Sequence, residues 1–219
     1  WWINAGASFD KSVAALAPDA KVIKALASFK VENQTQEKTI VKTRAPIEKL
    51  EKKMQEKLEK MGWVVSTISF DDNHIRLIGY NIEGAINDAL VAAAEISEHV
   101  IELKLSFSAL KDNDLNNLRK FKNLEKLWLD HTDISDNALK QVTALNNLGY
   151  LNIVNTKTTA SGVKNLMNLP NLKMIYLQGI KITTDERLAL ESIKTNVNLY
   201  FGDSMKSVIT DTIFVKKAE

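Results

Sequence analysis

The side chains that could carry out acid–base or metal chemistry are few in this chain of 219 residues. There are three histidines, His74, His99 and His131, and there is no cysteine. No two histidines are three or four residues apart, so the sequence predicts no metal site on a helix. The lack of cysteine excludes disulfides, thiolate metal ligands and a cysteine nucleophile.

The segment Asp130-His131-Thr132-Asp133 is the polar cluster of greatest interest, because it lies where a predicted strand passes into a loop. A structural role is the favoured interpretation. We expect Thr132 and Thr156 to bond to backbone groups of their loops, and Ser135 or Asp136 to cap the following helix.

Two further motifs have simple explanations. Asp71-Asp72-Asn73-His74 could ligate a cation, but a turn rich in Asp and Asn explains it better. Gly202-Asp203-Ser204 is similar to the start of a lipase-type serine motif, but it lacks the strand–turn–helix context and a nearby histidine. The eight glycines are scattered, so no phosphate-binding loop is predicted. Because no nucleophile, base and oxyanion site come together, we expect no enzyme activity.

The elements that position these residues repeat along the chain. Apolar residues with the spacing L-x-x-L-x-L return every 24 residues. The four copies are Val100/Leu103/Leu105, Leu124/Leu127/Leu129, Leu148/Leu151/Ile153 and Leu172/Ile175/Leu177. A helical stripe of apolar residues closes each unit. Since one strand and one helix cannot bury an apolar face alone, neighbouring copies must stack and share a core.

This pattern is typical of a leucine-rich repeat solenoid. We therefore predict an α/β fold with a parallel β-sheet on the concave face and helices on the convex face.

The sequence predicts four regions. Residues 75–203 hold about five leucine-rich repeats, of which the first is irregular. Residues 45–74 form an N-terminal cap made of a helix over 45–61 and a strand over 63–70. The two ends are interpreted as the tail of a preceding domain with a short helix and linker (1–44) and as a C-terminal tail (204–219).

Residues that alternate with the buried ladder must point to the concave face of the sheet. Trp128 and Tyr176 lie two repeats apart there, with Tyr150 and Val154 between them, and they form an amphipathic strip. Aromatic residues are common anchors in protein interfaces, and curved repeat sheets are common binding surfaces. The predicted partner-binding residues are Lys104, Ser106, Lys126, Trp128, Asp130, Tyr150, Asn152, Val154, Tyr176 and Gln178.

Several interpretations of this strip remain open from the sequence. The favoured one is a protein-interaction or scaffolding module. A glycan or peptidoglycan could instead stack on Trp128 and Tyr176, or the chain could be a purely structural spacer. The aromatic residues could also pack against the N-terminal segment or a neighbouring molecule.

The charge balance argues against two other classes of partner. The chain has 29 basic and 27 acidic residues and a net charge of +2, so no global field attracts nucleic acid or anionic lipid. The longest apolar run, residues 89–94, is far shorter than the roughly 20 residues that span a bilayer. We expect no nucleic-acid partner and no direct membrane insertion by these residues.

Two stretches of the sequence carry a resemblance to a known family. The opening Trp2-Ile3-Asn4-Ala5-Gly6-Ala7, followed by Ser8-Phe9-Asp10-Lys11, is similar to the W-I-x-x-G-A end of a c-type cytochrome domain. Residues 150–156 and 169–177 are similar to the phrases L-N-L-x-x-T and L-P-N-L-x-x-L-Y-L. The chain thus resembles the C-terminal leucine-rich-repeat (ribonuclease-inhibitor-like) region of large planctomycete and Bacteroidetes membrane proteins that carry a c-type cytochrome domain.

The resemblance implies a periplasmic position and a membrane tether and haem c domain in segments upstream of this chain. Because the sequence opens on Trp1-Trp2, we expect it to be part of a longer protein. It departs from the family in three ways: it has no Cys-x-x-Cys-His, so no haem c is expected in this part; Ile180 replaces a usual Thr; and Asp185-Glu186 replaces small residues. The ribonuclease-inhibitor label describes the repeat shape and does not imply inhibition of a ribonuclease.

Overall fold

The structure is a computed structural model that describes residues 44–80, 82, 85–193 and 195–202. By its internal contacts the chain divides into two units, Trp1–Ala45 and Pro46–Glu219. All of the described helices and strands belong to the second unit. The predictions for residues 1–43 and for the tail over 204–219 lie outside the described residues.

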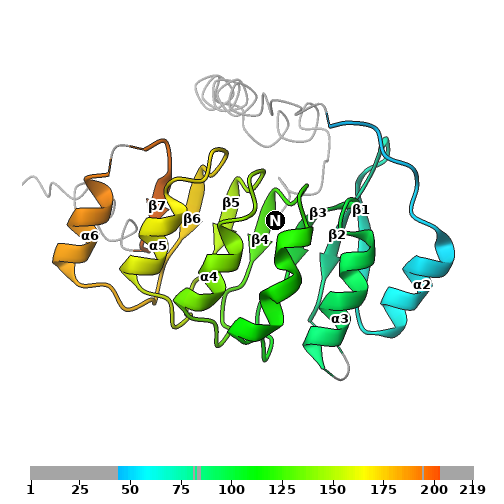
Figure 1. Ribbon diagram of the computed structural model, residues 1–219, viewed down its shortest axis with the longest axis horizontal. Helices are drawn as coiled ribbons and strands as arrows, with labels where there is room; N and C mark the ends of the chain where they lie inside the picture. Colours follow the sequence, from blue (N-terminus) through cyan, green and yellow to red (C-terminus); the bar gives the residue numbers. More distant parts are fainter. Residues whose placement is uncertain (1–43, 81, 83–84, 194, 203–219) are drawn as a thin grey trace, which may run out of the picture. The chain divides into compact units, whose positions relative to one another are not determined.

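The second unit is an α/β structure built on one seven-stranded sheet (Figure 1). The strands lie side by side in chain order, and only β1 and β2 pair antiparallel. The strands are β1 (Val64–Ser69), β2 (Asp72–Ile78), β3 (Val100–Lys104), β4 (Lys126–Trp128), β5 (Tyr150–Asn152), β6 (Met174–Tyr176) and β7 (Asn198–Tyr200).

Helical segments connect the parallel strands and cover one face of the sheet (Figure 1). A parallel pair requires such a crossover, because the chain must return to the same end of the sheet before the next strand begins. The α-helices are α2 (Lys52–Lys60), α3 (Ile86–Ala93), α4 (Asp136–Val142), α5 (Ala160–Leu166) and α6 (Thr184–Glu191), and the 3-10 helices are η2 (Ala94–Ile96) and η3 (Asp112–Lys120).

The 24-residue spacing of the sequence sets the register of the parallel strands. Leu103 pairs with Leu127, Leu127 with Leu151, and Leu151 with Ile175. All four side chains are fully buried, as predicted. Replacing one of them with alanine would cost about 2–5 kcal/mol of folding free energy.

The N-terminal cap differs from the prediction at its start. The predicted helix over 45–61 begins only at Lys52, and the residues before it are not helical. Asn73 Nδ2 donates a hydrogen bond to the Ile47 carbonyl over 2.9 Å, and His99 Nε2 lies 3.1 Å from the Glu48 carbonyl. Because side chains of the sheet region engage these carbonyls, the carbonyls are not available for helical hydrogen bonds, and the segment is irregular despite its helical pattern.

The first repeat also differs in one position. Tyr80 matches the buried columns of the later repeats in the sequence, but its side chain is 48 % exposed. The reason is the register of β2: Leu77 pairs with Leu103, so Tyr80 corresponds to Ser106, a position on the face of the sheet opposite the helices, and not to a buried ladder position.

The loops between strand and helix are held by a column of hydroxyl groups. Thr132 Oγ1 donates to the Leu129 carbonyl over 2.6 Å, and Thr156 Oγ1 donates to the Ile153 carbonyl over 2.8 Å. Both bonds confirm the predicted role of these threonines. The carbonyl groups just beyond the ends of the strands thereby gain hydrogen-bond partners.

A second polar column joins each repeat to the next at the start of the helices. Ser135 caps α4, as predicted, since its side chain accepts a hydrogen bond from the Asn137 amide. Asp136 instead bridges two repeats, because its carboxylate accepts from the Thr159 amide over 2.8 Å and from Thr159 Oγ1 over 2.6 Å. Asp112 bonds to Ser135 in the same way one repeat earlier.

Gly162 allows this bridge to form. It lies in the first turns of α5, where a Cβ atom would overlap Oδ1 of Asp136. Alanine normally stabilises a helix relative to glycine by about 1 kcal/mol. Here the Asp136 carboxylate would have to move away from Thr159 to admit it.

We predict that Gly162→Ala lowers the free energy of unfolding by about 1–2 kcal/mol, because it disrupts hydrogen bonds to a charged group. In an Asp136→Ala background the same change should be neutral or stabilising. Urea denaturation of the four proteins measures this coupling. Additive effects of the two substitutions would contradict the proposed steric link.

Candidate binding face of the sheet

The sheet has a second face, opposite the helices, which we call the open face. Side chains on either side of a buried ladder residue point to it because successive strand residues alternate. Around Leu127, for example, Lys126 is exposed and Trp128 is half-buried. The open-face residues are Arg76, Ile78, Tyr80, Glu102, Lys104, Ser106, Lys126, Trp128, Asp130, Tyr150, Asn152, Val154, Met174, Tyr176, Gln178, Asn198 and Tyr200.

Four rings on consecutive strands form a continuous row. The centroids of Trp128 and Tyr150 are 4.9 Å apart, those of Tyr150 and Tyr176 are 5.3 Å apart, and those of Tyr176 and Tyr200 are 4.6 Å apart. We call these residues the aromatic row. Each such ring pair contributes about 0.5–1.5 kcal/mol, so the row is a pre-organised surface rather than four independent side chains.

The rings of the row lean against one another. The planes of Tyr176 and Tyr200 differ by only 11°, while the other two pairs are tilted by 42° and 38°. Burial raises the pKa of the Tyr150 hydroxyl above its ordinary value of 10.0, so the phenol keeps its proton even further into the alkaline range than a free tyrosine. The row therefore combines apolar ring surface with phenol hydroxyls.

Three cations occupy the part of the open face formed by β2, β3 and β4. The Lys104 ammonium lies 5.3 Å from the Tyr80 ring centroid and 6.0 Å from the Trp128 ring centroid, both cation–π distances. Arg76 Nε and Lys126 Nζ contact opposite oxygens of Glu102, at 2.5 Å and 2.9 Å. We call Arg76, Lys104 and Lys126 the basic end of the open face.

Glu102 is only 3 % exposed, although its two partners reach solvent. Its burial by itself would raise the carboxyl pKa, but hydrogen bonds and charge from Arg76 and Lys126 together lower the pKa below its ordinary value of 4.5. Glu102 thus stays ionised and holds both cations against the sheet.

The Asp130 cluster is a structural network. Asp130 Oδ1 accepts from Ser106 Oγ over 2.7 Å and from Asn152 Nδ2 over 3.0 Å. His131 Nδ1 lies 3.2 Å from Asp130 Oδ2, and its Nε2 lies 2.8 Å from Asn155 Nδ2. Both imidazole nitrogens of His131 thus have partners within the cluster, and neither partner is a nucleophilic hydroxyl.

This network corrects two of the predicted contact residues. Ser106 is fully buried and Asp130 is 8 % exposed, so neither presents its side chain to a partner. Strand alternation places both at open-face positions just beyond β3 and β4, where they bond to each other and Asp130 also bonds to Asn152. Their role is to hold the loops.

The structure brings the remaining predicted residues to the open face. Lys126 and Gln178 are exposed, whereas Lys104, Trp128, Tyr150, Asn152, Val154 and Tyr176 are half-buried. Sequence reasoning missed Tyr200, which extends the aromatic row and lies 24 residues beyond Tyr176. It also missed Arg76, which pairs with Glu102 across β2 and β3.

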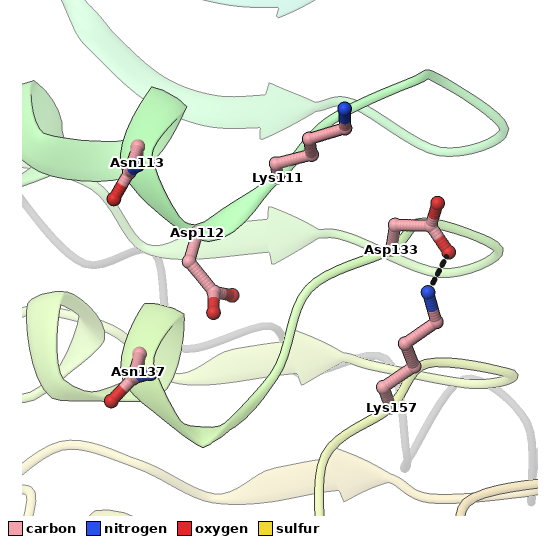
Figure 2. Close-up of a pocket in the computed structure, with 6 residues that line it drawn as sticks. All are labelled: Lys111, Asp112, Asn113, Asp133, Asn137 and Lys157. Carbon is pink, nitrogen blue, oxygen red and sulfur yellow. Dashed lines mark ion pairs between the residues drawn. The ribbon is translucent and has the colours of Figure 1, made fainter.

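A depression lies outside the open face, at the loops that lead into η3 and α4 (Figure 2). Its ionised side chains are Lys111, Asp112, Asp133 and Lys157. Asp133 pairs with Lys157 over 2.7 Å, and this hydrogen bond lowers the Asp133 pKa. Asp112 is used by Ser135. Because Asp112 and Asp133 already have partners, the depression offers no unpaired carboxylate to a ligand.

Neither a metal site nor a membrane span is found in the described residues. The described part of the chain contains no group of three or more His, Cys, Asp or Glu side chains placed to hold a metal ion. Among the helices described, none is both long enough and apolar enough to cross a membrane. No family model matches the chain, and no curated protein matches it significantly.

We predict that Glu102→Gln lowers the free energy of unfolding by about 1–3 kcal/mol at pH 7, because it removes hydrogen bonds to a charged group. The folded-state pKa of Glu102 is below its unfolded value, so its contribution is present above the unfolded pKa of 4.5 and is lost as the pH falls through the folded pKa. The difference between wild type and variant in urea denaturation should therefore shrink below that pH. A difference that is independent of pH would show that Glu102 acts through packing alone.

Proposed function

We propose that this chain is a leucine-rich repeat module that binds a protein partner through the open face of its sheet and has no catalytic activity. The repeat assignment is supported by the 24-residue register of the strands from β3 to β7, in which the ladder residues of β3 to β6 are fully buried. The open face would then be the concave surface of the solenoid, where repeat proteins commonly bind.

The aromatic row is the observation that carries this proposal. Trp and Tyr are enriched among the residues that dominate the affinity of protein interfaces. A row fixed by mutual contacts loses little side-chain entropy when a partner binds. Lys104, Asn152 and Gln178 beside it provide the polar groups that surround such anchors.

The ring geometry favours a protein over a glycan. A sugar would need a free ring face, whereas Tyr176 and Tyr200 stack face to face and the other rings are tilted onto their neighbours. The aromatic row then offers a partner its ring edges and phenol hydroxyls. These groups suit the mixed polar and apolar groups of a polypeptide.

We further propose that the module belongs to a larger exported protein, tethered on the periplasmic side of a membrane beside a haem c domain. The support for this part is the resemblance of Trp2-Ile3-Asn4-Ala5-Gly6-Ala7 to the end of a cytochrome domain. The full reading frame of the gene tests it: a Cys-x-x-Cys-His motif and membrane-spanning segments should precede Trp1.

The binding proposal predicts that a random-peptide display library selected on the wild-type chain yields ligands that bind the double variant Trp128→Ala/Tyr176→Ala much more weakly. We expect these ligands to lose at least about tenfold in affinity, because removal of an aromatic anchor typically costs about 2 kcal/mol or more. Fluorescence anisotropy of labelled peptides measures the dissociation constants.

Leu188→Ala is the matched control, because Leu188 is an exposed apolar residue on α6. This variant should bind the peptides as the wild type does. Peptides that bind the double variant equally well would refute the proposed site. If a glycan array instead gives ligands that depend on the two rings, the module binds carbohydrate; failure of both screens favours a structural spacer.

A further inference from the structure

Charge is distributed unevenly along the open face. The three cations of the basic end lie on β2, β3 and β4. From β5 to β7 the open-face positions carry no charge at all; they are Tyr150, Asn152, Val154, Met174, Tyr176, Gln178, Asn198 and Tyr200. A partner that covers the whole face therefore meets positive charge at one end and uncharged aromatic surface at the other.

The acidic groups nearest the basic end do not neutralise it. Glu102 is shared between Arg76 and Lys126, so that trio retains one net positive charge. Asp130 bonds to Ser106 and Asn152, and among the described residues it forms no ion pair with Arg76, Lys104 or Lys126. Within the described part of the chain, no carboxylate forms an ion pair with Lys104.

Lys104 is also held in position. Its ammonium sits near the rings of Tyr80 and Trp128, so the charge stays at the surface between two aromatic groups. An ammonium that keeps ring contacts but has no anion can accept a carboxylate with little loss of side-chain entropy. Trp128 belongs both to this position and to the aromatic row.

We propose that the partner is an acidic protein segment whose carboxylates bind at the basic end, one of them on Lys104, while its large apolar side chains pack on the aromatic row. This inference rests on the proposed function and names the chemistry of the partner. Complementary charge of this kind speeds association and fixes the orientation of the bound segment.

The distance between the basic end and the aromatic row limits how far apart the acidic and apolar residues of such a segment can lie. From Lys104 on β3 to Tyr176 on β6 is three strand spacings, or roughly 14 Å, which an extended peptide covers with about four residues. Acidic residues should therefore lie within a few positions of an aromatic or aliphatic residue. An extended segment across the strands would align its acidic end with β2–β4 and its apolar end with β5–β7.

The test uses the peptides that the display library yields on the wild-type chain. Those that depend on Trp128 and Tyr176 should be rich in Asp and Glu beside aromatic or aliphatic residues. Lys104→Glu should weaken their binding at least about tenfold, and added salt should weaken binding to the wild type. The matched control is Lys164→Glu, which reverses an exposed charge on α5 and should change the affinity by less than about twofold.

Two further measurements keep the outcomes distinct. Lys104→Glu should still unfold in one cooperative thermal transition, lowered only by the loss of the two cation–π contacts. A peptide with its acidic residues changed to Lys should bind Lys104→Glu better than it binds the wild type. Ring-dependent peptides without acidic enrichment, or with equal affinity for Lys104→Glu, would overturn this inference and leave the proposed function standing. Absence of any ring-dependent peptide would overturn both.

Discussion

The structure depends on one constraint: residues 24 positions apart must lie directly beside each other across the sheet. The ladder residues of β3 to β6 meet this constraint, since each pairs with the next along the sheet and all are fully buried; they are Leu103, Leu127, Leu151 and Ile175. No single strand and helix of this length could exclude water from its own apolar face. Stability is therefore shared along the stack, and the loss of one ladder residue would weaken contacts on both sides of it.

The polar columns make this stacking possible without leaving buried backbone groups unpaired. Threonine hydroxyls satisfy the carbonyls at the ends of the strands, and the Asp112 and Asp136 carboxylates join each helix start to the next repeat. The column ends where Ala160 replaces the aspartate; there Thr183 bonds instead to Glu186 within its own helix. α6 is thus capped within its own helix, while α4 and α5 are capped by Ser135 and Thr159, each of which also bonds to an aspartate of the preceding repeat.

The same register that buries the ladder also builds the open face. Strands paired in register place every second side chain beside its counterpart, so aromatic residues that are 24 positions apart, or diagonal neighbours, come within contact distance. The side chains of this face hold one another in place, because neighbouring aromatic rings are in contact and because Glu102 pairs with both Arg76 and Lys126. A surface of this kind needs little reorganisation on binding, which is the physical basis for proposing that it recognises a partner.

The sequence by itself determined the ladder, the alternation of strand and helix, the threonine hydrogen bonds and the outward position of Trp128 and Tyr176. These follow from periodicity, which is a local and repeated property of the chain. Only the tertiary structure decided that the helix begins at Lys52, because Asn73 and His99, from distant parts of the chain, contact the Ile47 and Glu48 carbonyls before it. It also decided that Ser106 and Asp130 are buried and that Arg76 and Lys126 both contact Glu102. Glu102 and Lys126, like Ser106 and Asp130, are 24 residues apart, so the period places each pair side by side, but only the folded chain decides that these side chains bond and which of them are buried. The contacts of Arg76 with Glu102 and of Asn73 with the Ile47 carbonyl do not follow the 24-residue period, so the sequence pattern does not indicate them.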